Sequence, residues 1–172
     1  MKKTLFLART ALLLAVAIAF QLFGKFIPYN NFIVGPVVNA VLLVATAAAG
    51  VWSGISISVI APLVSAFTNK APIAPLVLGF SPFIIIGNII IVLSFHFLRK
   101  KNAVLSVAVG SVLKFGFLYG AISVFTSLVE MKPQAAATLT NLFSWPQLFT
   151  ALAGGAIALV ILKLAGKSLD IS

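Results

Sequence analysis

Long apolar runs, separated by short polar connections, dominate the chain. Each run is continuous and lacks the alternation of apolar and polar residues that marks a membrane β-strand. A helix needs about 20 apolar residues to cross the hydrocarbon core of a bilayer. We therefore predict an all-α integral membrane protein, a bundle of six transmembrane helices over residues 5–24, 33–51, 54–68, 75–98, 103–128 and 145–166.

The connections differ between the two sides of this predicted bundle. A tight turn at Trp52-Ser53-Gly54 and the basic segment 99–102 join helices on one side. The connections on the other side are longer and contain proline and asparagine; they cover residues 25–32, 68–75 and 130–144. Because loops held by a rigid scaffold often carry recognition, we expect a ligand site to open toward this second side.

The basic residues predict the orientation. One of the 12, Lys114, lies within a span, and the longer connections hold three, which are Lys25, Lys70 and Lys132. The side of the chain ends holds eight, which are Lys2, Lys3, Arg9, Arg99, Lys100, Lys101, Lys163 and Lys167. Lysine and arginine concentrate in cytoplasmic segments. Both termini are therefore predicted to lie inside the cell, an N-in/C-in topology.

Composition supports a membrane protein with one domain over residues 1–172. Hydrophobic residues make up 62% of the chain and charged residues 8%, against roughly 45–50% and about 25% in soluble domains. The net charge of +10 therefore reflects topology rather than nucleic-acid binding. Ala15-x-Ala17 resembles a signal-peptide cleavage site, but Arg9 and the continuation of the run to Phe23 predict a retained helix.

Lys114 is the main chemical candidate, because no acidic residue lies within any predicted span. A cation at mid-bilayer costs about 2.5–3.5 kcal/mol on insertion scales. It could serve an anionic or carbonyl-rich ligand, or it could snorkel or bond backbone carbonyls; its central depth favours the first interpretation. Asn88 lies at a similar depth, about 20 Å from the outer end of its helix, and could bind ligand or another helix. Asn39 is a further embedded amide.

Other polar and aromatic residues lie near the outer ends of the predicted spans. Tyr119 and Trp145 could face a pocket or anchor the chain at the membrane interface. Asn30 and Asn31 could bind ligand or simply form a turn. The last span begins near Asn141 and Gln147. On the first helix, Ala8, Ala11, Ala15 and Ala19 form a flat stripe for packing within the chain or for docking another membrane subunit.

Several functional classes are disfavoured by what the sequence lacks. There is no cysteine, and His96 has no second histidine or nearby carboxylate, so we predict no metal site and no cofactor. No cluster of catalytic groups indicates an enzyme. Secondary transporters usually embed a carboxylate or histidine, although backbone carbonyls can bind sodium. No GxxxxGK[ST] motif is present, so the energy for any transport is expected to come from partners.

Three segments in this order resemble one family. They are Ala11-x-x-x-Ala15, with Ala15-x-x-x-Ala19 as a second register; GPVVNAVLLVATAAAGVWSGISISVIAPLVSAF at 35–67; and APIAPLVLGFSPFIIIGN at 71–88. Together with the length and the six predicted spans, they resemble the S-component, the substrate-binding membrane subunit, of energy-coupling factor (ECF) vitamin transporters. The alanine motif is similar to the family's docking motif, and the resemblance covers nearly the whole chain.

The resemblance implies a multi-pass protein of the prokaryotic cell membrane that binds a vitamin or vitamin precursor at an outward-facing site. It implies docking on a transmembrane coupling subunit with two ATPases, followed by toppling of the subunit in the membrane. The implied docking residues are Ala11, Ala15 and Ala19. The implied substrate-binding residues are Asn30, Asn31, Asn69, Asn88, Lys114, Tyr119, Asn141, Trp145 and Gln147.

The substrate and two rival functions stay open at this point. One embedded cation without an acid disfavours a cationic vitamin such as thiamine. A largely neutral, aromatic or heterocyclic vitamin with at most one acidic or carbonyl group is expected, with riboflavin or a cobalamin precursor such as α-ribazole as examples. The rivals are a small secondary transporter that works alone and an assembly subunit of a membrane complex that binds no ligand.

Overall fold

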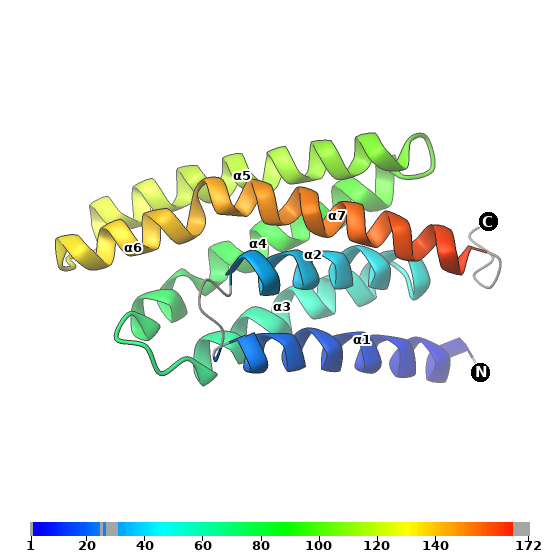
Figure 1. Cartoon of the computed structure of the whole chain (residues 1–172), viewed down its shortest axis with the longest axis horizontal. Coiled ribbons are helices and arrows are strands. Elements are labelled where there is room, and N and C mark those ends of the chain that lie inside the picture. The colour runs from blue at the N-terminus through cyan, green and yellow to red at the C-terminus, as the bar shows by residue number, and fades with distance from the viewer. Residues whose placement is uncertain (1, 25, 27–30, 167–172) are drawn as a thin grey trace.

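All regular structure in the described part of the chain is helical. The computed structural model describes residues 2–24, 26 and 31–166, and Figure 1 shows these residues as a bundle of long helices. The helices are α1 (Lys2–Gly24), α2 (Asn31–Ala48), α3 (Val51–Thr68), α4 (Ala74–Leu98), α5 (Ala103–Leu128), α6 (Pro133–Phe143) and α7 (Trp145–Ala165). The predicted all-α class is confirmed.

Five helical stretches among the described residues are long and apolar enough to cross a membrane. They are Lys3–Gly24, Val51–Thr68, Ala74–Leu98, Ala103–Leu128 and Pro133–Ala165, the last of which joins α6 and α7. Helix α2 supplies a shorter apolar stretch, Phe32–Ala48. The helices support a multi-pass membrane protein, while the count of six spans and the N-in/C-in orientation stay predictions.

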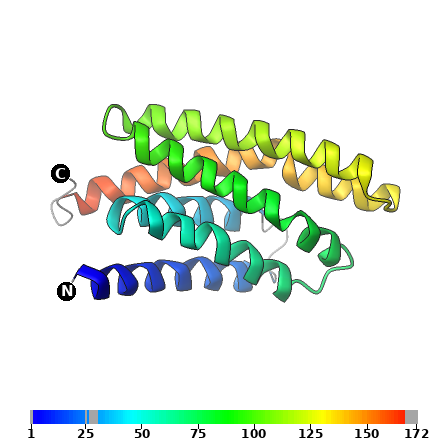
Figure 2. The same ribbon diagram turned by 180° about the vertical axis from the view of Figure 1, so that it is seen from behind.

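The first five helices alternate in direction along the bundle, and α6 and α7 follow each other in one direction, antiparallel to α5 (Figures 1 and 2). The start of α1, the turn at Ala49-Gly50, the connection 99–102 and the end of α7 lie together at one end, here called the terminal end. The start of α2 and the connections 69–73 and 129–132 lie at the opposite end, here called the loop end. The two sets of connections predicted from sequence therefore fall at opposite ends.

The turn between α2 and α3 lies earlier in the chain than predicted. Trp52-Ser53-Gly54 was expected to form it, but these residues belong to α3. Gly50 makes the turn with a φ of 101°, a conformation that costs glycine little because it has no Cβ. Arg9 Nη1 donates a hydrogen bond of 2.6 Å to Ala48 O and so satisfies one of the free carbonyls at the end of α2.

Helix α6 is a second difference between the structure and the prediction from sequence. Residues 130–144 were predicted to form a loop, but Pro133–Phe143 is a helix of 11 residues. Pro133 stands in its first turn, where a missing N–H costs nothing and the fixed φ suits a helix. Ser144, with φ −102° and ψ −127°, breaks the helix before α7 begins at Trp145, with Pro146 in its first turn. The proline and asparagine in this segment therefore mark helix boundaries and a helix surface, not an extended loop.

The buried side chains form two clusters along the bundle. The cluster in the terminal half joins α1, α2, α3, α4, α5 and α7 through aliphatic residues such as Leu42, Ile57 and Ile91. The cluster in the loop half is aromatic in part and joins α4, α5 and α6; its buried members are Phe80, Leu118, Ile122, Leu139 and Phe143. Phe80 contacts Phe83, Phe125 and Phe143 with ring centroids 4.7–5.3 Å apart.

Glycines bring α7 close to α2 and α5. A Cβ on Gly154 would lie 2.5 Å from Pro36 O and 2.6 Å from Asn39 Cβ, and a Cβ on Gly155 would collide with Val107. Small residues at such crossings let membrane helices approach until their backbones nearly touch. The approach at Gly154 fixes the position of Asn39, whose side chain lies at mid-bundle.

Replacing Gly154 with alanine should destabilise the protein by about 1–3 kcal/mol, because the new methyl group would press on backbone atoms of α2. Thermal unfolding of the detergent-purified protein measures the effect. Gly116→Ala on α5 is the matched control, since a Cβ there meets no atom within 4 Å; it should leave the unfolding temperature unchanged or raise it slightly. Equal unfolding temperatures for Gly154→Ala and the native protein would contradict this account.

Candidate functional site

A buried lysine at the centre of the bundle joins three helices. Lys114 Nζ on α5 donates hydrogen bonds to Asn39 Oδ1 on α2, at 2.7 Å, and to Asn88 Oδ1 on α4, at 2.8 Å. All three side chains are at most 3% exposed. The side-chain amide of Asn39 also donates to Gly35 O, one turn earlier in α2, at 2.9 Å. We call Asn39, Asn88 and Lys114 the central cluster.

The central cluster holds a cation among neutral acceptors. Amide oxygens accept the ammonium hydrogens but do not neutralise the charge. Glu130 is the only acidic residue in the described part of the chain, and it is exposed in the connection at the loop end. A buried charge is costly unless it is paired or hydrogen-bonded, so the two asparagines make the lysine tolerable at this depth.

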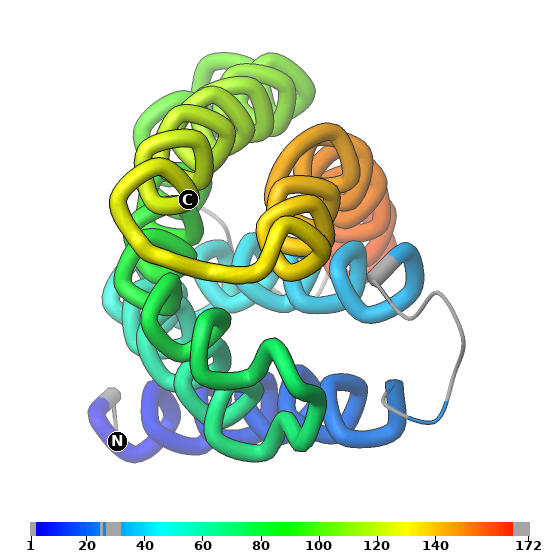
Figure 3. Tube along the Cα trace, turned by 90° about the vertical axis from the view of Figure 1, so that its left-hand side faces the viewer, coloured from blue at the N-terminus to red at the C-terminus, as the bar shows by residue number. Residues whose placement is uncertain are grey.

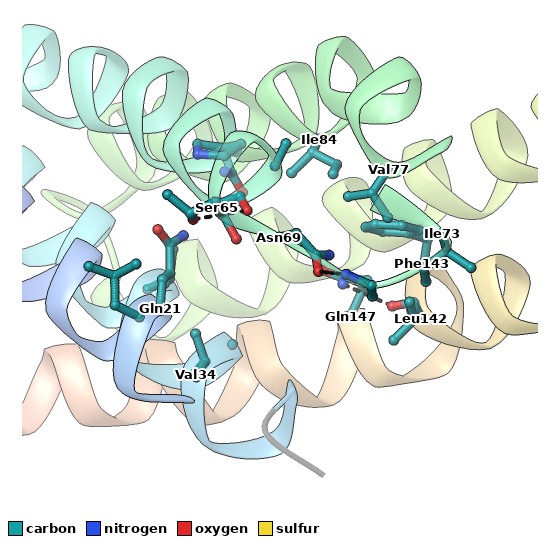
Figure 4. A pocket seen from close by; sticks show the side chains of 18 of the residues that line it. Gln21, Val34, Ser65, Asn69, Ile73, Val77, Ile84, Leu142, Phe143 and Gln147 are labelled. Carbon is teal, nitrogen blue, oxygen red and sulfur yellow. Dashed lines mark hydrogen bonds between the residues drawn. The ribbon is translucent and has the colours of Figure 1, made fainter. Parts of the chain in front are cut away.

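A cavity of about 980 Å³ extends from the central cluster toward the loop end. Figure 4 shows part of its wall from close by, and Figure 3 looks into the bundle from the loop end. Every helix contributes to the lining, but α5 contributes only Lys114. The volume is in the range typical of small-molecule sites.

The lining has a polar part and an apolar part. Besides the central cluster, its polar residues are Gln21, Ser65, Thr68, Asn69, Lys70 and Gln147. Its apolar residues include Ile73, Val77, Ile84, Leu142 and Phe143, which lie on the α4 and α6 side in Figure 4. A wall of this kind suits an organic molecule that is apolar on one side and forms hydrogen bonds on the other.

Three of the polar residues that line the cavity differ from one another in their hydrogen bonding. Asn69 Oδ1 accepts from Ala71 N at 2.9 Å, which fixes the connection between α3 and α4. Gln147 Nε2 donates to Leu142 O at 3.0 Å, across the break between α6 and α7. The oxygen Oε1 of Gln21 is buried and has no hydrogen-bond partner among the described residues. Buried polar atoms are almost always satisfied, so this oxygen needs a donor that the described residues do not supply.

The structure brings some of the predicted binding residues together. Lys114, Asn88, Asn69 and Gln147 all line the cavity. Asn30 lies outside the described residues, and Asn31 begins α2 with a side chain that is outside the described part.

Tyr119, Asn141 and Trp145 do not line the cavity, and their side chains are exposed. Trp145 is 69% exposed and stacks on Phe115, with ring centroids 5.1 Å apart, and Tyr119 is 48% exposed. Five residues along a helix turn the side chain by about 140°, which places Tyr119 on the outer face of α5 when Lys114 points inward.

The predicted binding residues omit several polar residues that line the cavity, among them Gln21, Asn39 and Ser65. The sequence predicted no role for Gln21 or Ser65 and indicated only that Asn39 is an embedded amide. Each interrupts an apolar run with a polar side chain, and that interruption was the available signal. Helical spacing alone does not show that α1, α2 and α3 turn these side chains toward the same space as Lys114.

The alanine stripe of α1 faces away from the bundle. Ala11 and Ala15 are exposed, and Ala19 is half-buried. The opposite face of α1 packs on α2 and α3 through Leu13, Leu14 and the fully buried Ala17.

Comparison with known proteins gives one match. Residues 5–165 match the family model described as "ECF transporter, substrate-specific component". No curated protein and no solved structure matches the chain.

Replacing Asn88 with leucine should destabilise the protein by about 1.5–3 kcal/mol, since hydrogen bonds to charged groups contribute about that much and Lys114 would keep only Asn39. Thermal unfolding in detergent without added ligand measures the loss. Gln134→Leu, which also exchanges an amide for leucine but at an exposed position of α6, should change stability by less than about 0.5 kcal/mol. If the two variants unfold alike, the central cluster does not stabilise the fold.

Proposed function

Because the chain belongs to the family of substrate-specific components of ECF transporters, we propose that it is the high-affinity binding subunit for a vitamin or vitamin precursor. The cavity ending at Lys114, Asn39 and Asn88 carries this proposal. The ligand enters from the loop end, which faces the cell exterior, and binds between the polar and apolar parts of the wall. The protein performs no chemistry on it.

Lys114, Asn88, Asn69 and Gln147 contact the ligand directly in this proposal. All four line one continuous cavity, and they come from α4, α5, α7 and the connection between α3 and α4. Asn30, which lies outside the described residues, and Asn31, which begins α2, are proposed to contact the ligand as well. Tyr119, Asn141 and Trp145 lie on the outer surface near the loop end, where aromatic side chains anchor a membrane protein at the interface.

The energy for uptake comes from partners. We propose that α1 docks on a transmembrane coupling subunit that carries two ATPases, in the cell membrane of a prokaryote. The exposed stripe of Ala11 and Ala15, continued by Ala19, supports this surface because no part of the described chain covers Ala11 or Ala15. Small side chains allow a partner helix to approach closely. Toppling of the docked subunit would then carry the cavity to the cytoplasmic side.

The purified protein should bind one vitamin-like molecule in the cavity. A ligand at 100 times its Kd raises stability by about 2.7 kcal/mol, so binding is detectable as a shift in thermal unfolding across a vitamin panel. Ser65→Trp would fill the cavity from α3 and should abolish the shift. Ser123→Trp, at an exposed position of α5, should leave it intact. If the Ser65→Trp protein still binds, the ligand site lies elsewhere.

Bulky residues on α1 should separate transport from binding. Ala11→Trp or Ala15→Trp should abolish ATP-driven uptake in liposomes containing the complete transporter, because tryptophan would hold the coupling subunit away from α1. Ligand binding by the isolated subunit should be unchanged. Val112→Trp, on the exposed face of α5, is the control and should transport normally. Uptake at the native rate by both alanine variants would show that this stripe is not the docking surface.

A further inference from the structure

The floor of the cavity offers hydrogen-bond donors. Lys114 has three N–H groups and gives two of them to the amide oxygens of Asn39 and Asn88. The Asn39 amide nitrogen is committed to Gly35 O. The Asn88 amide nitrogen makes no hydrogen bond within the part of the chain that the structure describes, and Asn88 lines the cavity. One ammonium hydrogen and one amide group therefore stay available for a bound molecule.

The charged residues that line the cavity also carry one sign of charge, which is positive. Lys114 at the floor and Lys70 toward the loop end both line the cavity, and no acidic residue of the described part of the chain does. Glu130 lies outside it. A cavity lined by one sign of charge and walled by apolar groups concentrates ligands of the opposite sign. The cation at the floor thus has neutral acceptors but no counter-ion within the described chain.

From these observations we infer that the ligand carries a carboxylate, which binds at the floor of the cavity between the Lys114 ammonium and the Asn88 amide nitrogen. This inference rests on the proposed function. One carboxylate oxygen accepts from Lys114 Nζ and the other from Asn88 Nδ2, and the single negative charge balances the single buried cation. This narrows the expectation from sequence, which also allowed an uncharged carbonyl group.

A phosphate suits this floor less well. It carries close to two negative charges at neutral pH and is commonly bound by the paired donors of arginine. No arginine lines the cavity among the described residues, and Lys114 is the one buried cation there. A second charge would be left without a partner in an apolar surrounding, which is costly.

The rest of the cavity wall indicates the chemistry of the remaining part of the ligand. Val77, Ile84, Leu142 and Phe143 provide an apolar surface between the floor and the loop end. Gln21 Oε1, which is buried without a partner among the described residues, accepts from an N–H or O–H group on the ligand's other side. The ligand is therefore an amphiphilic organic acid with its carboxylate innermost and at least one donor farther out.

Paired probes that differ only in charge test this inference. The detergent-purified full chain is titrated with pantothenate and panthenol, biotin and biotinamide, nicotinate and nicotinamide, and lipoate and lipoamide, with riboflavin and thiamine as uncharged and cationic probes. At least one acid should bind, and its neutral partner should bind about 10- to 100-fold more weakly, as expected for loss of a charged hydrogen bond.

Two variants test whether the preference for an acid arises at the floor of the cavity. Asn88→Asp places a carboxylate beside Lys114 without changing the size of the side chain, so it keeps the fold and competes with the ligand; affinity for the acid should fall about 10- to 100-fold. Asn102→Asp is the matched control, because Asn102 caps α5 at the terminal end and aspartate caps as well; it should bind like the native protein.

The outcomes separate the two proposals. Preference for a neutral or cationic probe, or undiminished binding of the acid by Asn88→Asp, would overturn the carboxylate inference and leave the vitamin-binding function standing. If none of the probes, charged or neutral, shifts thermal unfolding, both the inference and the proposed function are wrong. An acid preference that Asn88→Asp removes and Asn102→Asp keeps would establish the site.

Discussion

The burial of one lysine at mid-bundle is the constraint on which the rest of the structure depends. Lys114 is buried at this depth except where it lines the cavity, so its ammonium depends on hydrogen bonds to side chains of neighbouring helices. Asn39 and Asn88 meet that need from α2 and α4. Their positions require close helix packing, which Gly154 provides where α7 crosses α2. The polar interaction thus joins three helices, and the close packing at Gly154 adds α7 as a fourth.

This interaction also separates the two hydrophobic clusters. Aliphatic side chains fill the terminal half, where the helices pack with small residues. Phenylalanines hold α4, α5 and α6 together in the loop half. The cavity opens beside this second cluster, and Phe143 belongs to both. The protein therefore combines a tightly packed half with a half that contains a cavity. This arrangement is consistent with a substrate-specific subunit.

Helix α1 stands apart from this arrangement. Its face toward α2 and α3 contains Ala17 and Thr10, and Thr10 bonds Ser53 at 2.8 Å. The opposite face displays alanines and large aliphatic residues to the surroundings. A helix packed on one side only can present its outer face to a partner without disturbing the cavity. Gln21, near its end, still reaches the cavity wall, so α1 links the outer surface to the cavity.

The sequence by itself determined the helical class, the helix limits within a few residues and the family, and it placed Lys114 and Asn88 deep within their helices. Apolar run length and an isolated embedded charge are local signals. The sequence did not predict helix α6, because proline and asparagine at helix boundaries are also typical of a loop. Only the tertiary structure decided that Asn39, Gln21 and Ser65 face the same space as Lys114. The angle at which each helix is rotated about its axis depends on packing against its neighbours, and no short stretch of sequence records it.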